Sequence, residues 1–112
     1  MDTTRTPERN ALTVIFEFDI EAEEQQPLRV GIERLIREVV SRQPGFVAAN
    51  LHVSRDGQKV LNYLEWESLE AFERFRDDKD KQRRIRSVIG SYGPKPRVYD
   101  LVFTAASTNR SQ

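Results

Sequence analysis

Alternation of apolar and polar residues in one short segment constrains the fold more than any other feature of this chain. Side chains of a β-strand point alternately to the two faces of a sheet. Between residues 11 and 20 every second side chain is apolar, namely Leu12, Val14, Phe16, Phe18 and Ile20. The segment therefore predicts a strand with one buried face, and hence a domain in which another layer covers that face.

A helix and a β-hairpin are predicted next. Apolar residues spaced three and four apart from Leu28 to Val39 indicate an amphipathic helix over about residues 27–42, with Pro27 at its start. Pro44-Gly45 stops this helix. The segments 46–54 and 58–66 then flank Asp56-Gly57, which is the arrangement expected of a hairpin.

Two helical segments and a last strand complete the pattern. Ser68 is placed to cap a helix whose inward residues are Leu69, Phe72 and Phe75. Asp78 or Asp80 opens a second segment with Ile85, Val88 and Ile89 facing inward. Gly90 and Gly93-Pro94 end the helical region, and residues 97–103, RVYDLVF, predict the final strand.

The order β-α-β-β-α-β predicts an α+β, ferredoxin-like domain, in which a four-stranded antiparallel sheet has both helical regions on one face. The chain has 112 residues, enough for one domain with one core. We expect this single domain to span residues 11–104, with flexible tails at 1–10 and 105–112.

The other face of the sheet is predicted to lack a cover. On the hairpin and the last strand it would present an apolar patch larger than a soluble monomer usually exposes. Its predicted members are Phe46, Leu61, Tyr63, Tyr99, Leu101 and Phe103. We therefore expect a homodimer that joins sheet to sheet; the alternative is that the tails cover part of this face.

Composition excludes several classes of partner. Eighteen basic residues balance eighteen acidic ones, so no basic field favours nucleic acid. Neither a signal peptide nor a membrane span is evident, and the lack of cysteine fits a cytoplasmic protein. The absence of cysteine and the single histidine also argue against a metal site.

Two polar side chains in the predicted strand VLNYLEW are the strongest functional signal. Asn62 and Trp66 share a face with Val60 and Leu64, the face expected to be buried. A buried amide without partners costs roughly 1 to 3 kcal/mol. Asn62 is therefore either satisfied within the protein or reserved for a ligand. An ordinary core or interface position is the alternative for Trp66.

The only imidazole, His52, is a candidate base whose position depends on the hairpin turn. A two-residue turn at Asp56-Gly57 pairs residue 53 with 60 and 51 with 62, which places His52 on the face opposite Asn62. A three-residue turn with a bulge reverses this parity. Alternation of apolar residues from Val47 to Val53 favours the first register, so a structural or interfacial His52 is expected.

The PGF turn at 44–46, the segment DGQKVLNYLEWES at 56–68 and the phenylalanine-rich helix after it resemble the antibiotic biosynthesis monooxygenase family of dimeric α/β barrels. Within that family the chain looks most similar to cofactor-free enzymes that oxidise anthrone-type phenols of aromatic polyketide pathways to quinones with dioxygen. The resemblance implies no cofactor, a polycyclic aromatic substrate, and Asn62, Trp66 and Arg86 as catalytic residues. We expect Leu51, Leu64, Phe72 and Phe75 to contact the substrate.

Two positions differ from, or are left open by, the pattern that this resemblance implies. Arg84 and Arg86 flank the apolar stripe of their helix at similar angles, so periodicity does not choose between them, and the resemblance favours Arg86. Phe72 stands where a tyrosine able to transfer a proton is expected. Proton delivery would then fall to Arg86, water or the substrate.

Three other functions are compatible with the same fold to different degrees. A polyketide cyclase would close rings by acid-base chemistry without consuming oxygen. A haem-degrading monooxygenase would need a histidine on the later helix, which has none. A non-catalytic ligand-binding or accessory subunit is favoured if Asn62 bonds to backbone and aromatic side chains fill the pocket.

Overall fold

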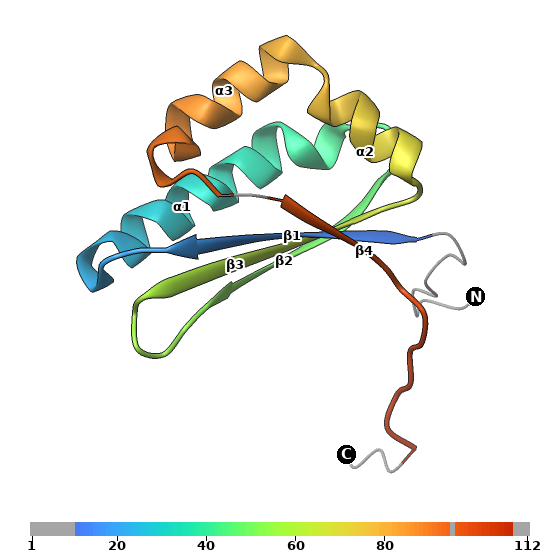
Figure 1. Ribbon diagram of the computed structural model, residues 1–112, viewed down its shortest axis with the longest axis horizontal. Coiled ribbons are helices and arrows are strands. Elements are labelled where there is room, and N and C mark those ends of the chain that lie inside the picture. The colour runs from blue at the N-terminus through green and yellow to red at the C-terminus, as the bar shows by residue number, and fades with distance from the viewer. Residues whose placement is uncertain (1–10, 95, 109–112) are drawn as a thin grey trace.

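Four antiparallel strands form one sheet in the order β2-β3-β1-β4 in the computed structural model, which describes residues 11–94 and 96–108. The predicted ferredoxin-like arrangement is confirmed, with all three α-helices on one face of the sheet (Figure 1). The predicted tail at 1–10 and the end of the chain from 109 lie outside the described residues. The strands are β1 Leu12–Asp19, β2 Phe46–Val53, β3 Lys59–Trp66 and β4 Pro96–Asp100.

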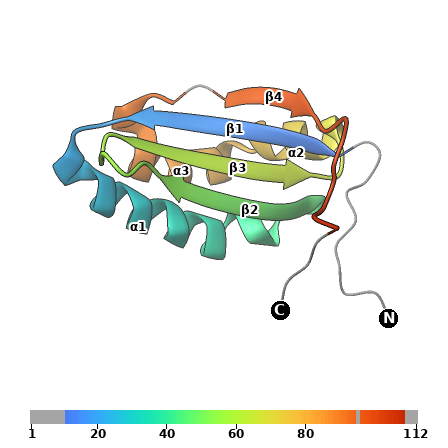
Figure 2. The same cartoon turned by 90° about the horizontal axis from the view of Figure 1, so that it is seen from below.

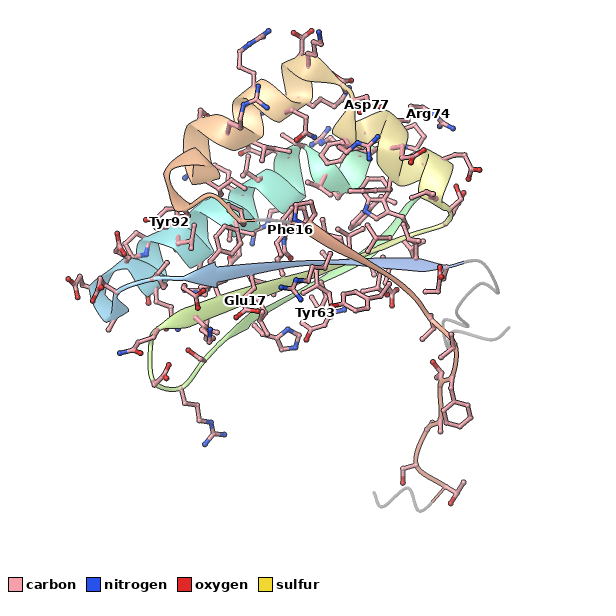
Figure 3. The ribbon with its side chains drawn as sticks, in the orientation of Figure 1. Phe16, Glu17, Tyr63, Arg74, Asp77 and Tyr92 are labelled. Atoms are coloured by element: carbon pink, nitrogen blue, oxygen red, sulfur yellow. The ribbon has the colours of Figure 1, made fainter. Side chains whose placement is uncertain are left out.

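β1 lies in the middle of the sheet, because it pairs with both β3 and β4. Leu12, Val14, Phe16 and Phe18 face the helices as predicted, and all are buried except Phe16, which is partly accessible. Phe16 points toward the helical layer, whereas Glu17 and Tyr63 point away from it (Figure 3). Phe16 lies directly opposite Asn62 in the register. The alternation thus places the candidate amide beneath the helices.

α1, Ala22–Glu38, begins earlier than predicted and contains Pro27 within it. The acidic stretch that precedes the proline supplies the helix start. The backbone N–H of Glu21 donates to Oε1 of Glu24 at 3.0 Å, which satisfies a backbone donor at this terminus. The negative charges of Glu23 and Glu24 in the first turn also interact favourably with the positive end of the helix dipole. These contributions offset the single backbone hydrogen bond that proline cannot make.

The second helical region is two helices, α2 Leu69–Arg76 and α3 Lys79–Ile89, broken where predicted. The Ser68 hydroxyl accepts a hydrogen bond from the Ala71 N–H at 3.1 Å, so its predicted capping role is confirmed. Asp78, rather than Asp80, caps α3, since its Oδ1 accepts from the backbone N–H of Lys81 at 3.2 Å.

The inward faces of α2 and α3 differ from the prediction at one position each. Leu69 is exposed, and Ala71 is buried beside Phe72 and Phe75 instead. Leu69 is the first residue of α2, and the face of the helix that packs on the sheet is formed by the later residues Ala71, Phe72 and Phe75. Val88 is also exposed, at 39% of its surface, although its Cγ1 approaches Gly31 of α1 closely enough to leave no room for a Cβ there.

The hairpin has the predicted register, with Val53 opposite Val60 and Leu51 opposite Asn62. His52 consequently lies on the face opposite Asn62, as predicted. It is exposed, and its ring centroid lies 5.2 Å from that of Tyr63 in an edge-to-face contact. His52 is therefore remote from the helix-covered face.

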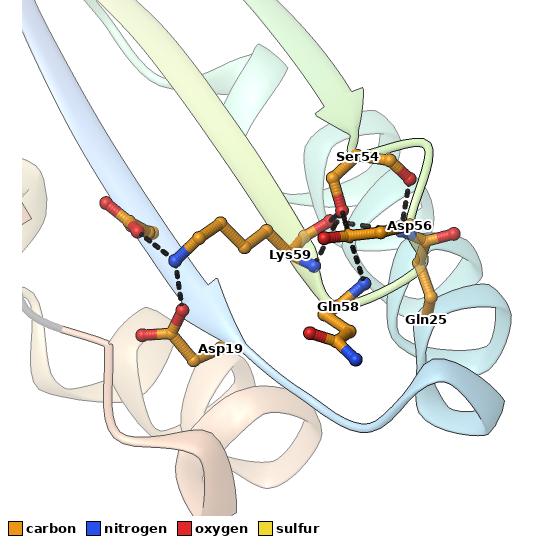
Figure 4. A network of polar contacts seen from close by, with 7 residues as sticks. Asp19, Gln25, Ser54, Asp56, Gln58 and Lys59 are labelled. Carbon is orange, nitrogen blue, oxygen red and sulfur yellow. Dashed lines mark hydrogen bonds and ion pairs between the residues drawn. The ribbon is translucent and has the colours of Figure 1, made fainter.

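The hairpin loop holds this register through side-chain hydrogen bonds (Figure 4). Asp56 Oδ1 accepts from the Ser54 hydroxyl at 2.7 Å and from the Gln58 N–H at 2.9 Å. Gln25 of α1 donates to the Ser54 carbonyl at 3.0 Å, which joins the loop to the helical layer. Beside the loop, Lys59 donates to both Glu17 and Asp19, and these hydrogen bonds raise the pKa of Lys59.

A β-bulge between Phe46 and Ala48 overturns one part of the predicted open face. The extra residue reverses the parity of β2 at its start. Phe46 therefore turns to the helix side, where its ring meets Trp66 edge to face with centroids 5.6 Å apart.

Leu61, Tyr63 and Tyr99 lie on the open face as predicted, and Figure 2 shows this face without helices in front of it. The prediction was wrong for Leu101 and Phe103, which follow the end of β4 and are not in the sheet. Leu61, Tyr63 and Leu101 are half-buried, and Tyr99 is 46% exposed. β4 is shorter than predicted, because the chain leaves the sheet after Asp100 and descends on the uncovered side (Figure 1). In this descending segment Phe103 is 80% exposed. Within residues 11–94 and 96–108, no helix has the length and apolarity that crossing a membrane requires.

Candidate active site

A cavity of about 300 Å³ lies between the sheet and the helices. This is within the range of pockets that hold small organic ligands, roughly 300 to 1,000 Å³. Its floor comes from β1 and β3, one wall from α1, its cover from α2 and α3, and its remaining side from the connection to β4. Its lining includes Phe16, Phe18, Asn62, Leu64, Phe72, Phe75, Arg76, Gln82, Arg86, Ile89, Pro94 and Pro96.

Asn62 is the polar side chain of the cavity floor. It is 8% exposed, and its Oδ1 has no hydrogen-bond partner among the described residues. Its neighbours along the same strand face, Val60 and Leu64, are fully or nearly fully buried. Of the two alternatives open from the sequence, an amide satisfied within the protein is thus not found here. The Asn62 side chain that carries this buried, unpaired acceptor lines a cavity large enough for a ligand.

The cover of the cavity includes a polar row from the two later helices. Gln82 and Arg86 of α3 line the cavity four residues apart, and Arg76 lines it from the end of α2. The apolar Ile89 lies one further turn along the same face of α3. Arg84 does not line it, because its guanidinium pairs with Glu38 of α1. Periodicity did not choose between Arg84 and Arg86, and the structure places Arg86 at the cavity. No ion pair of Arg86 is found among the described residues.

Phe72, Phe75 and Leu64 line the cavity as expected, whereas Leu51 and Trp66 do not. Trp66 is 0% exposed because the rings of α2 cover it. Its ring stacks on Phe75 with centroids 5.3 Å apart and is tilted against Phe72 at 6.0 Å. The indole N–H has no partner among the described residues. The face assignment of Trp66 was right, but aromatic rings separate it from the cavity.

Several cavity residues were not predicted from the sequence. Phe16 was assigned only to the core, although it is the one accessible member of its buried strand face. Gln82 could have been found from its spacing of four residues from Arg86. Pro94 and Pro96 reach the cavity only through the path of the connection to β4, for which the sequence has no periodic signal.

The charged side chains that line the cavity are all basic. Arg76 and Arg86 are its charged lining residues, and no Asp or Glu is among the described residues that line it. The hydrogen bond with Asp77 raises the pKa of the Arg76 guanidinium, which stays charged at any physiological pH. In the described part of the chain, no group of three His, Cys, Asp or Glu side chains is placed to hold a metal ion.

A ferredoxin-like sheet with a largely apolar, ligand-sized cavity beneath its helices, and an unpaired amide on the cavity floor, defines the class of protein as a small-molecule enzyme of α+β fold. The chain belongs to the antibiotic biosynthesis monooxygenase family, whose model matches residues 11–84. It is accordingly a monooxygenase. The resemblance inferred from the sequence is confirmed at the level of family.

Individual relatives agree with this assignment. The chain is 28% identical to tetracenomycin-F1 monooxygenase of Streptomyces glaucescens over 106 residues, which are 95% of each chain. The monooxygenase ActVA-Orf6 of Streptomyces coelicolor, solved in complex with nanaomycin D, superposes with a TM-score of 0.67 at 24% identity, covering 89% of this chain and 95% of that one. SnoaB, a cofactor-independent oxygenase of Streptomyces nogalater, gives a TM-score of 0.66 at 21% identity over 91% and 99% of the two chains.

Proposed function

We propose that this monooxygenase oxidises a multi-ring phenolic substrate of the anthrone type to a quinone, with dioxygen as co-substrate and without a cofactor. The observation that supports this most directly is the buried, unpartnered Oδ1 of Asn62, a residue on the floor of a largely apolar cavity. An apolar cavity suits fused aromatic rings, and a free amide suits a phenol or carbonyl on their edge.

The reaction requires little covalent chemistry from the protein. Loss of a proton from the ring methylene gives a delocalised carbanion, which supplies electrons to dioxygen. The resulting peroxide collapses, so that the methylene becomes a carbonyl and one oxygen atom leaves as water. The protein then contributes orientation and stabilisation of negative charge.

Asn62 and Arg86 have complementary roles in this proposal. The Asn62 oxygen accepts a hydrogen bond from a substrate hydroxyl and thereby fixes the rings on the cavity floor. Arg86, on the cover, is a cation without an ion pair among the described residues, positioned to stabilise an enolate or peroxide as charge develops. Removal of one such donor typically costs about 10² to 10³ in rate.

The aromatic residues take supporting positions. Phe72 lines the cavity and can pack on a substrate ring, but it has no proton to give, so proton delivery falls to water, Arg86 or the substrate. Trp66 stands behind Phe72 and Phe75 and holds these rings in place. A direct role for its N–H would require both rings to move.

The test is dioxygen uptake by metal-free, cofactor-free protein with an anthrone, with quinone absorbance followed in parallel. Uptake matched to quinone formation above the spontaneous rate is the expected result. Binding without uptake would reject the oxidation and favour a cyclase, and no binding would reject this substrate class.

Matched variants of one helix assign the cation. Arg86→Gln is expected to lower kcat by about a hundredfold, because the developing anion loses its positive partner. Arg84→Gln is the control, since Arg84 pairs with Glu38 outside the cavity. Equal effects of the two changes would remove Arg86 from the mechanism.

We also propose that the protein is a homodimer joined through the open face of the sheet. The exposed part of Tyr99 and the half-buried Leu61 and Tyr63 form an apolar surface there. Sedimentation velocity should find a dimer, and Tyr63→Glu should produce monomers because it places a charge in the contact. A wild-type monomer at micromolar concentration would refute this. A cytoplasmic location stays a prediction from the sequence.

A further inference from the structure

We propose that Arg76 and Gln82 form a subsite for a carboxylate on the multi-ring substrate, and that Arg76 is therefore a specificity-determining residue. The inference rests on the proposed function, because it concerns one substituent of the same substrate. It assigns a separate task to each cavity arginine: Arg86 acts on the reacting oxygen, and Arg76 recognises an acidic group elsewhere on the molecule.

Two contacts orient the Arg76 side chain. Its Nε and Nη2 donate to the carboxylate of Asp77, at 3.1 and 3.4 Å. Its guanidinium carbon lies 6.0 Å from the centre of the Phe72 ring, which lines the cavity. The guanidinium thus lies at the edge of the cavity, where an aromatic wall and the end of α2 meet, and half of the Arg76 side chain is exposed to solvent.

Donor groups remain available at this position. A guanidinium has five N–H donors, so the two contacts with Asp77 leave the Nη1 group free. Gln82 uses one N–H of its amide to donate to the Phe75 carbonyl at 3.0 Å, and a second N–H remains. Because Phe75 directly precedes Arg76, this hydrogen bond ties Gln82 of α3 to the end of α2 beside the arginine.

The positive charge of the cavity lining favours an acidic group on the ligand. Asp77 offsets part of the charge of Arg76 but is not among the residues that line the cavity. A carboxylate brought into the cavity meets cations and N–H donors and no lining carboxylate that would repel it. A carboxylate also matches the planar fork of a guanidinium better than a neutral amide or ester does.

The experiment uses calorimetric binding of an anthraquinone monocarboxylic acid and of its neutral carboxamide, neither of which can undergo the oxidation. Wild-type protein is expected to bind the acid about tenfold more tightly than the amide, as one charge-assisted contact near the surface allows. Arg76→Gln should abolish this preference, and Arg76→Lys should retain part of it. Arg74→Gln is the matched control. It changes the other arginine of α2, which does not line the cavity, and it should leave the preference for the acid intact.

Three outcomes would overturn the subsite: equal binding of acid and amide by the wild type, an acid preference that survives Arg76→Gln, or failure of the wild type to bind the acid. These results are independent of turnover. An acid preference that depends on Arg76 in a protein without dioxygen uptake would support the subsite and refute the proposed oxidation, and turnover without an acid preference would do the reverse.

Discussion

Replacement of Asn62 by leucine should stabilise the protein while abolishing its turnover. The amide oxygen is buried and has no partner among the described residues. A buried polar group that is reserved for a ligand lowers the stability of the ligand-free fold, whereas one with a structural partner raises it. The sign of the stability change therefore distinguishes the two explanations of the buried amide.

The expected magnitude follows from the surroundings of Asn62. Leucine removes an unpaired polar atom, which is worth about 1 to 3 kcal/mol. The larger side chain has room, because the strand face carries Val60 and Leu64 on either side and borders a cavity of about 300 Å³. At roughly 4 °C per kcal/mol for a domain of this size, Tm should rise by at least about 4 °C.

The assay is urea unfolding of ligand-free protein followed by tryptophan fluorescence, with thermal unfolding in parallel. Leu64→Asn is the control for direction: it adds a second unpaired amide two residues along the same face, and should lower stability by about 3 kcal/mol or more. A loss of more than about 1 kcal/mol in Asn62→Leu would refute the reasoning, because it would mean that the amide has a structural partner.

Three further outcomes are expected. Trp66→Phe should lower the free energy of unfolding by about 1 to 2 kcal/mol, because the packing lost around the smaller ring outweighs the removal of the unpaired indole N–H. Urea unfolding and oxygen uptake should show this loss with kcat reduced less than tenfold; a larger fall in kcat at unchanged substrate binding would show that the indole N–H acts directly. Gly45→Ala should cost at least about 2 kcal/mol in urea unfolding, since Gly45 has φ +85° and a Cβ there would collide with Ala71, and a near-neutral change would contradict this. The hydrogen bonds with Lys81 lower the pKa of Asp78 below its ordinary 3.8, so the carboxylate stabilises the fold above that pH and loses this contribution as the pH falls through the lowered value. Between pH 5 and 2, Tm of Asp78→Asn, which keeps a capping side chain, should fall less than that of the wild type, and parallel decreases would refute the assignment.

The sequence predicted the elements because their signals are local. Alternation identified the buried face of β1, and the register of the hairpin followed from the same rule. Ser68 was identified as a cap because capping depends on residues only three positions apart. The start of α1 was missed because a proline was weighed above the acidic residues that precede it.

The site was predicted less completely, and particular residues explain why. Phe46 changed faces through a bulge, which alternation does not reveal. Arg84 and Arg86 are equivalent on a helical wheel, and Glu38 of another helix distinguishes them by pairing with Arg84. Trp66 lies on the predicted face, yet α2 covers it and leaves Asn62 at the cavity.

By itself, the sequence determined which residues form strands and helices, which face of β1 and β3 is buried, and that an amide lies on that face. These properties depend on the repeat of the backbone, about two residues in a strand and 3.6 in a helix. Only the tertiary structure decided which buried residues border the cavity and which arginines reach it. The lining of the cavity and the choice of arginine both depend on contacts between side chains of separate elements, such as Trp66 with Phe75 and Arg84 with Glu38. The periodicity of one element does not predict which side chains of another element it will contact.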